Sequence, residues 1–354
     1  MIHGTRRRVL KGAAGLGVAA IIPSRLVSAQ DLTAQEKELH AAAQKEGEVT
    51  WYTGQMQAEP SEAIGAAFTE RYPGVKVNVV RSTSQVAFQR LSQDMRARVQ
   101  QCDVFSSTDV SHLSFLKERG QLLDYKPANT DGLLDIVRQA SDPDGFYFVT
   151  YLAPYLMGRR TDRVSDADAP KSWTDLLDPR WKGQISIGHP GFSGAIGVWA
   201  VLMKKLHGPD YLRRLERNSP QIGRSSADPV TVLNSGERTI GAAMPSATTL
   251  LSISRGNPLK LIYPTDGTVI VPAPSGAIRE AKNPNGAKLF MEFMTGPAYS
   301  TTVRKFFAES LRTDVPPPDG AEPLDKIKLL MASNEEVEKG VPEIREEWRD
   351  IFGV

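Results

Sequence analysis

Hydroxyl and amide side chains gather in three short segments, each of which follows a predicted strand and precedes a predicted helix. The segments are Tyr52-Thr53-Gly54-Gln55, Ser82-Thr83-Ser84 and Ser107-Thr108-Asp109. Free backbone N–H groups at the start of a helix favour an anion, and hydroxyl side chains add further donors. Arg81, directly before the second segment, adds a positive charge. Because such side chains also simply cap helices, a binding site requires that the fold bring the segments together.

Alternating strands and helices position these segments. Strands predicted over 48–53, 75–80 and 103–107 alternate with helices over 63–72, 85–99 and 110–119, after a first helix over 32–46. Ser61 is predicted as an N-cap and Gly47 as a helix stop. Alternation of this kind predicts parallel pairing in a doubly wound sheet, in which ligands bind beyond the carboxyl ends of the strands.

The second half of the chain repeats this order. Strands predicted over 184–187, at 222 and over 239–244 precede helices over 195–207, 229–236 and 248–255. Candidate binding residues follow two of these strands: His189, Ser193, Gly194 and Ser246. Helices are also predicted over 209–218, 283–294, 298–307 and 335–354, the last with Trp348 and Ile351 as its buried anchors.

The stretch from 147 to 160 is rich in aromatic and β-branched residues, which favour a strand, although Pro154 argues against an uninterrupted one. We interpret it as the strand that leaves one lobe and enters the other, with strands over 259–264 and 269–272 as the return crossing. Tyr151 and Asp266 then lie beside the cleft, although an Asp-Gly pair is also typical of a turn. The predicted lobes are 30–150 with 264–313, and 151–263 with 314–354.

The composition of the chain limits the classes of function that it can have. The chain has 354 residues, 40% hydrophobic and 24% charged, with a net charge of +2, which gives no reason to expect nucleic-acid binding. The single cysteine, Cys102, allows no internal disulfide and no cysteine metal cluster. Residues 1–29 combine adjacent arginines, a short apolar run and a Val-Ser-Ala end, typical of a twin-arginine signal peptide. We therefore expect a periplasmic protein whose mature form begins near Gln30.

Several sequence runs together resemble a known family. They are EGEVTWYTGQ, YPGVKVNVVRSTS, CDVFSSTDVSHLSFLKERGQL, APKSWTDLLDPRWKGQISIGHPGFSG, YPTDGTVIVPAPSGAI and NPNGAKLFMEFMTGPAYS. The chain is similar to the extracellular solute-binding proteins of ABC importers, in the ferric-iron-binding-like branch. The resemblance implies a type II periplasmic-binding-protein fold: two lobes, each a doubly wound mixed sheet flanked by helices, joined by hinge strands. It also implies a monomeric receptor that closes on one small ligand, docks on an inner-membrane permease and carries no cofactor or enzymatic activity.

Members of the similar family differ in the ligand that they bind. Members that hold ferric iron directly share a pair of adjacent tyrosines after a strand like 241–244, whereas this chain reads Pro245-Ser246-Ala247-Thr248-Thr249 and has no adjacent tyrosine pair. Other branches bind organic anions, including sugar phosphates and phosphonates. The leading hypothesis is therefore a receptor for a phosphorylated, phosphonate or carboxylate compound, with no metal.

Two alternatives stay open. The first is an iron carrier that uses scattered tyrosines, a histidine and an exogenous anion. The second is an exported hydrolase, for which the chain offers five histidines but no GxSxG or HExxH motif. His112 or His189 would have to pair with a serine, and nothing in their spacing indicates this.

Overall fold

The structure is a computed structural model that describes residues 32–354, so the predicted signal peptide lies outside the described residues. The helices are α1 Ala34–Glu46, α2 Ala58–Arg71, α3 Ser84–Arg96, α4 Val110–Glu118, α5 Asp135–Ala140, α6 Gly194–His207, α7 Tyr211–Glu216, α8 Asp228–Ser235, α9 Ser246–Ser254, α10 Pro284–Thr295, α11 Pro297–Arg304 and α12 Asn334–Phe352. The strands are β1 Glu48–Thr53, β2 Lys76–Arg81, β3 Val104–Ser106, β4 Phe148–Arg160, β5 Ile185–Gly188, β6 Gln221–Gly223, β7 Ile240–Pro245, β8 Leu259–Ile262, β9 Thr268–Ala277 and β10 Leu329–Leu330.

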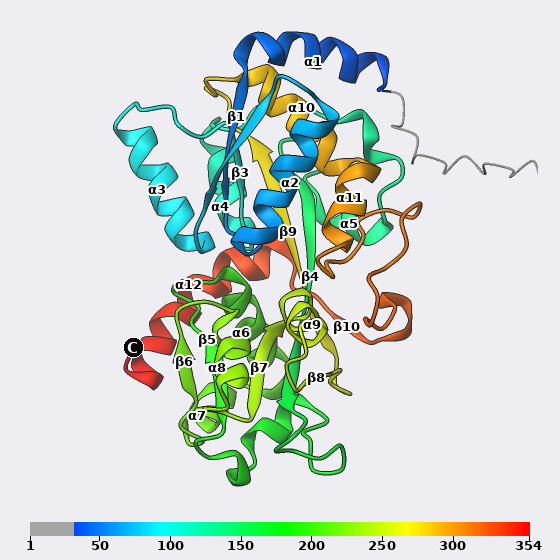
Figure 1. Cartoon of the computed structure of the whole chain (residues 1–354). Helices are drawn as coiled ribbons and strands as arrows, with labels where there is room; N and C mark the ends of the chain where they lie inside the picture. The colour runs from blue at the N-terminus through cyan, green and yellow to red at the C-terminus, as the bar shows by residue number, and fades with distance from the viewer. Residues whose placement is uncertain (1–31) are drawn as a thin grey trace, which may run out of the picture. The chain divides into compact units, whose positions relative to one another are not determined.

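Two groups of parallel strands form the sheet, as the alternating pattern predicts. The first group has the order β2-β1-β3 and the second the order β7-β5-β6. Two long antiparallel strands, β4 and β9, lie side by side between the groups (Figure 1). Strand β9 pairs with β3, and β4 pairs with β7. The sheet is therefore mixed, with parallel pairing inside each group.

Strand β4 crosses from one group to the other. Residues 148–155 pair with β9, whereas residues 155–160 pair with β7 and β8. The strand is continuous through Pro154, so the expected interruption is wrong. Pro154 is paired with Ile270 of β9, and β7 begins to pair only at Tyr155. The missing N–H of the proline therefore falls where β4 has a neighbour on one edge alone.

Helices cover each strand group around its own aromatic core. Beside the first group, Phe68 of α2 packs edge-on against Phe290 of α10, which also contacts Trp51 of β1. Beside the second group, Trp199 of α6 contacts Trp173 and Tyr211. Burial of such rings is a main source of stability and fixes the strand ends that carry the site.

Local differences from the sequence prediction have simple causes. Helix α2 begins at Ala58, earlier than predicted, so Ser61 lies inside it and its hydroxyl donates to the Gln57 carbonyl instead of capping the helix. Pro60 is tolerated because a first helical turn needs no backbone donor. Strand β8 pairs only with β4, so β9 alone makes the return crossing. Trp348 of α12 is buried, but Ile351 is half-buried.

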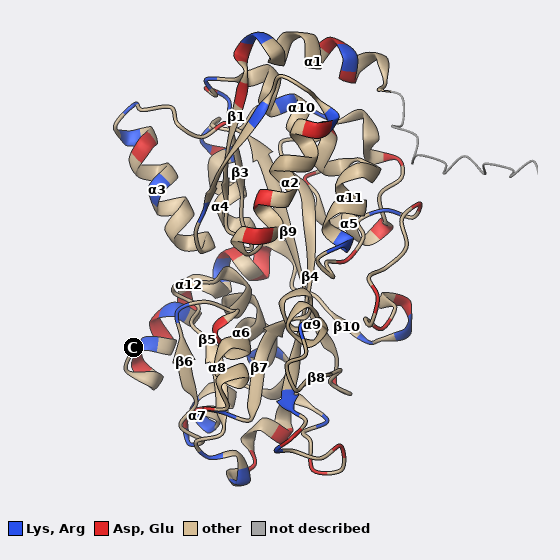
Figure 2. Cartoon of the chain, viewed as in Figure 1, with Lys and Arg blue, Asp and Glu red and all other residues tan. Residues whose placement is uncertain are grey.

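None of the helices between residues 32 and 354 has the length and apolar character needed to cross a membrane. Lys, Arg, Asp and Glu are distributed over both strand groups (Figure 2), in line with the net charge of +2.

Candidate ligand-binding site

A cavity of about 300 Å³ is lined by residues from both strand groups. Its walls come from the loop after β1, the starts of α3, α6 and α8, one face of α9, and the crossing strand β4. Eight predicted site residues line it: Gly54, Gln55, Arg81, Thr83, Ser84, Thr108, Tyr151 and Ser193. The fold therefore brings together the three hydroxyl-rich segments of the first half and one from the second.

Gly54 allows the loop after β1 to lie directly on the start of α3. A Cβ atom at position 54 would lie 2.5 Å from the Cα of Ser84, far inside van der Waals contact. The Ser84 hydroxyl donates to the Gly54 carbonyl at 3.2 Å and lies 2.8 Å from the Thr108 hydroxyl. These contacts hold three strand ends together at one side of the cavity, which only glycine at position 54 permits.

Arg81 supplies positive charge to the cavity wall. Its Nε donates to the Met56 carbonyl at 3.0 Å, and among the described residues no hydrogen bond or ion pair is found for its terminal nitrogens. Burial lowers the pKa of Arg81, and the Asp228 carboxylate opposes this shift. The group remains charged, since an arginine titrates far above neutral pH. A planar guanidinium with free donors suits a carboxylate or phosphate.

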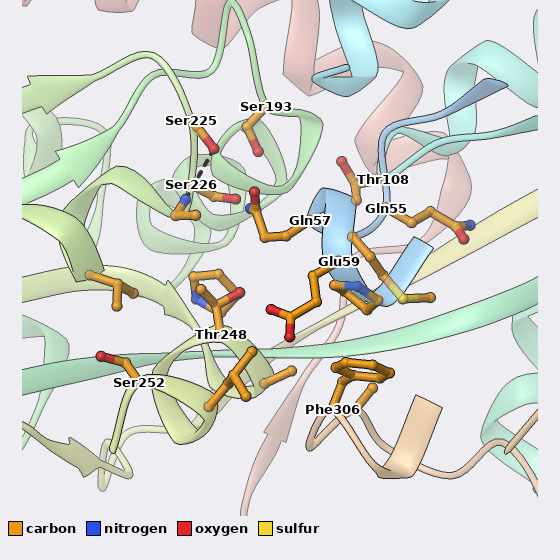
Figure 3. A pocket seen from close by; sticks show the side chains of 18 of the residues that line it. Gln55, Gln57, Glu59, Thr108, Ser193, Ser225, Ser226, Thr248, Ser252 and Phe306 are labelled. Atoms are coloured by element: carbon orange, nitrogen blue, oxygen red, sulfur yellow. Dashed lines mark hydrogen bonds between the residues drawn. The ribbon is translucent and has the colours of Figure 1, made fainter. Parts of the chain in front are cut away.

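Helix starts face the cavity from the second strand group. Ser193 is the N-cap of α6, is 6% exposed, and makes no capping hydrogen bond. Ser225 and Ser226 precede α8, and the Ser225 hydroxyl accepts from the Ala227 N–H at 3.2 Å. Figure 3 shows Ser193, Ser225 and Ser226 on the same side of the cavity. Their hydroxyls and the partial positive charge of the helix starts favour an anion here.

Tyr151 and Tyr155 of β4 form an aromatic part of the wall. Burial raises the pKa of both phenols, that of Tyr155 to about 12. The Tyr155 hydroxyl lies 3.5 Å from that of Ser226. Both phenols are therefore neutral at physiological pH, the form that can donate a hydrogen bond.

An ion pair at the cavity joins the two strand groups. Arg255, which follows α9, lies with its Nη2 2.5 Å from Oε2 of Glu59 in α2, and both residues line the cavity. Both side chains are about half exposed, so water screens the pair and its energy is small.

Gln55 lines the cavity, but its side chain is directed away from Gln57 and Glu59 towards β9 (Figure 3). Its Nε2 donates to the carbonyls of Ala273 at 2.7 Å and Pro274 at 3.0 Å. The amide is therefore already hydrogen-bonded within the protein and is not free for a ligand.

The remaining predicted residues of the first half lie outside the cavity lining. Tyr52 is buried, and its hydroxyl donates to Asp94 at 2.8 Å. Thr53 is buried beneath the loop, and Ser82 lies beside it, its N–H donating to the Thr53 carbonyl. The Asp109 carboxylate is buried and caps α4, because it accepts from the N–H of Ser111.

Four predicted residues of the second half also lie elsewhere. His189 contacts Trp348 of α12 and the backbone oxygen of Val354. Gly194 packs against Asp109, Ser246 is buried as the first residue of α9, and the Asp266 carboxylate accepts from the Trp173 N–H. None of the four lines the cavity, so this geometry gives no support to their proposed ligand contacts.

Sequence reasoning missed several lining residues: Gln57, Glu59, Ser225, Ser226, Asn234, Thr248, Ser252, Arg255, Asn257 and Phe306. Thr248 and Ser252 share one face of α9, and Arg255 follows the helix at the next position of this spacing. A polar spacing of four and three residues could have revealed the three side chains. Ser225 and Ser226 repeat the pattern of a strand, a hydroxyl-rich loop and a helix. Phe306 follows α11 and carries no such signal.

A serine, a histidine and an aspartate do meet, but they are buried beside the cavity and do not line it. The Ser107 hydroxyl lies 2.9 Å from Nδ1 of His112, whose Nε2 is 3.5 Å from Oδ2 of Asp109. All three are buried, with Ser107 0% exposed, and none lines the cavity. Burial lowers the pKa of His112 to about 4. The cluster supports the start of α4, since the Asp109 N–H donates to Ser107.

Comparison with known proteins identifies the family of the chain. Residues 100–332 match the family of bacterial extracellular solute-binding proteins, and the chain belongs to this family. An uncharacterized protein of Haemophilus influenzae is 28% identical over 240 residues, 66% of this chain and 68% of that one. A putative 2-aminoethylphosphonate-binding periplasmic protein of Salmonella typhimurium is 25% identical over 196 residues, 52% of this chain and 55% of that one.

Solved structures share the fold. The periplasmic binding protein AfuA from Actinobacillus pleuropneumoniae, solved with fructose-6-phosphate bound, has a TM-score of 0.76 at 23% identity and covers 87% of this chain and 98% of its own. Iron-bound HitA from Pseudomonas aeruginosa has a TM-score of 0.73 at 18% identity, covering 86% and 99%. The predicted type II periplasmic-binding-protein fold is confirmed, and the protein is a solute-binding receptor.

Proposed function

We propose that the chain is the periplasmic receptor of an ABC importer and captures a small organic anion, a phosphorylated, phosphonate or carboxylate compound, in the cavity described above. Arg81 is the observation that carries this proposal. It places a guanidinium with free terminal donors in the same cavity as the hydroxyls at the starts of α6 and α8. The named ligands of two related proteins, 2-aminoethylphosphonate and fructose-6-phosphate, belong to the same chemical class.

Hinge closure between two lobes is the second part of the proposal. We assign 30–150 with 264–313 to one lobe and 151–263 with 314–354 to the other. The change of partner along β4, and the antiparallel pairing of β9 beside it, support a hinge in these two strands. Closing would present a surface to a membrane permease, and export by the twin-arginine route remains part of the proposal.

The chain lacks the adjacent tyrosine pair that the family resemblance associates with direct iron binding, which supports an organic anion over iron. The neutral phenols of Tyr151 and Tyr155 can donate hydrogen bonds to such an anion. Among residues 32–354, no group of three or more His, Cys, Asp or Glu side chains is arranged to hold a metal ion.

Native mass spectrometry with metal analysis, followed by a thermal-shift screen, tests the proposal. The screen contains fructose 6-phosphate, 2-aminoethylphosphonate, inorganic phosphate, citrate and ferric citrate. We expect one class of metal-free anion to stabilise the folded state, by about 2.7 kcal/mol when present at a hundredfold excess over Kd. A single bound ferric ion per chain, or no stabilisation by any anion, would contradict the proposal.

Arg81→Met sharpens the test. Loss of charged hydrogen bonds, each about 1.5–3 kcal/mol, should weaken binding of the stabilising anion by roughly 10- to 100-fold. The matched control is Arg96→Met, because Arg96 is exposed on α3 and lies outside the cavity lining. Titration calorimetry measures both variants, and equal affinities would show that Arg81 is not the anion contact.

A further inference from the structure

An irregular position in the crossing strand lies next to the cavity. Val149 of β4 is paired with Pro274 of β9, and Tyr151 is paired with Ala273, so Thr150 is an extra residue without a partner. Such a β-bulge re-aims the side chains that follow it. The first of these side chains is Tyr151, whose phenol lines the cavity.

Gln55 reaches both strands at this bulge. Its Nε2 donates to the carbonyls of Ala273 and Pro274, and its Oε1 accepts from the Thr150 hydroxyl at 3.3 Å. Ala273 is the partner of Tyr151, and Thr150 is its neighbour in the chain. Gln55 is 6% exposed and Thr150 is 0% exposed, so these bonds are shielded from water and costly to lose.

Two further contacts complete the network. The Ser275 hydroxyl lies 2.5 Å from that of Thr150, and the Tyr299 hydroxyl donates to the Thr150 carbonyl at 2.6 Å. Pro272 and Pro274 remove backbone donors from this part of β9, and the Gln55 amide supplies donors there instead. Fully satisfied buried networks of this kind fix one conformation.

We propose that Gln55 is a positioning residue of the binding site, which holds the Tyr151 phenol and the Gly54–Gln57 loop in register through the bulge at Thr150. The proposal rests on the proposed binding function and adds to it. The Gln55 amide touches no ligand. It ties the loop after β1 to the strands β4 and β9, so the first-group wall of the cavity and the crossing strands keep one relative arrangement.

Fluorine NMR tests the positioning without any ligand. The protein is labelled with 3-fluorotyrosine at its nine tyrosines, and the Tyr151 resonance is assigned by its loss in Tyr151→Phe. We expect Gln55→Met, which keeps the side-chain length but removes the amide, to move the Tyr151 resonance. The control Gln93→Met, at an exposed position of α3, should leave it in place. An unmoved Tyr151 resonance together with a lowered Tm would overturn the proposal, because Gln55 would then only fill space.

Binding of fructose 6-phosphate gives the second readout. Gln55→Met should weaken it at least tenfold, and should weaken it less in the Tyr151→Phe background, because the two residues act through one contact. Equal losses in both backgrounds would contradict the proposal. If the unsubstituted protein does not bind this probe, the anion that stabilises it in the screen takes its place. If no anion of the screen binds, the proposed ligand class fails, and the fluorine resonance alone decides the role of Gln55.

Discussion

At the scale of single residues, the ability of the cavity to bind a ligand depends on which polar side chains are not already hydrogen-bonded within the protein. Arg81 and Ser193 face the cavity with donors to spare, whereas the Gln55 amide and the Asp109 carboxylate are used within the fold. In a sequence, all four residue types look equally suitable for binding a ligand. Only the hydrogen bonds of the folded chain separate a side chain that can bind a ligand from one that positions the backbone.

Glu309 gives a prediction at this scale. It follows the cavity-lining segment 306–308, is 4% exposed, and burial raises its pKa from 4.5 to about 7. The folded state then holds a proton that the unfolded chain releases near pH 4.5. The contribution of protonated Glu309 to the free energy of unfolding is therefore complete below that pH, and it is lost as the pH rises through about 7. Glu309→Gln should therefore be more stable than the wild type at pH 8, by about 3 kcal/mol.

Urea unfolding between pH 4 and 8 measures this effect. The difference between Glu309→Gln and the wild type should vanish at pH 4. The control Glu346→Gln, at an exposed position of α12, should leave the pH dependence unchanged. A Glu309→Gln protein with the same pH slope as the wild type would show that Glu309 does not titrate in this range.

At the scale of elements, close approach between helix starts fixes the site. Helix α6 begins against the N-cap of α4, and Arg345 of α12 donates to the same Asp109 carboxylate at 2.8 Å. Gln85 of α3 donates to it as well, also at 2.8 Å. Asp109 therefore joins four helices, and these donors explain how an acidic side chain can be buried beside the cavity.

Gly194→Ala tests this packing. The added Cβ would lie 2.5 Å from the Cβ of Asp109, so α6 must shift, at a cost of about 1–3 kcal/mol in unfolding free energy. Because Ser193 moves with α6, anion affinity should fall too. The control is Gln93→Ala at an exposed position of α3, where the change in unfolding free energy should stay within about 0.5 kcal/mol. Equal stabilities of the two variants in chemical unfolding would refute the packing argument.

At the scale of the whole molecule, ligand retention depends on contacts between the two strand groups. Glu59 and Arg255 make such a contact at the cavity. Removing either charge by substitution to glutamine should speed ligand dissociation by up to about fivefold, the equivalent of about 1 kcal/mol for an exposed pair. The effect should shrink in 1 M salt, where charges are screened within about 3 Å.

Stopped-flow measurement of dissociation checks this prediction. The exchanged pair Glu59→Arg with Arg255→Glu should restore slow dissociation, since the attraction is the same with the charges reversed. Lys339→Gln, which breaks the exposed pair with Glu335 on α12, is the control and should have no effect. Fast dissociation in the exchanged variant would show that the individual side chains, rather than their attraction, matter.

The sequence by itself determined the strand and helix order, the parallel groups and the location of most hydroxyl-rich loops at strand ends. These features follow from local signals: hydrophobic periodicity, glycine and proline, and helix-capping residues. The prediction that β4 crosses between groups also came from its composition, and the family resemblance came from short motifs spread along the chain.

The tertiary structure alone decided how those loops combine. Strand pairing sets the cavity wall by joining residues distant in sequence, as where Gln55 meets Ala273 and Glu59 meets Arg255. It also let Pro154 stay inside a continuous strand, because the neighbouring strand begins one residue later. The physical reason is that hydrogen bonds and side-chain contacts between distant segments depend on register and distance, which no local preference encodes.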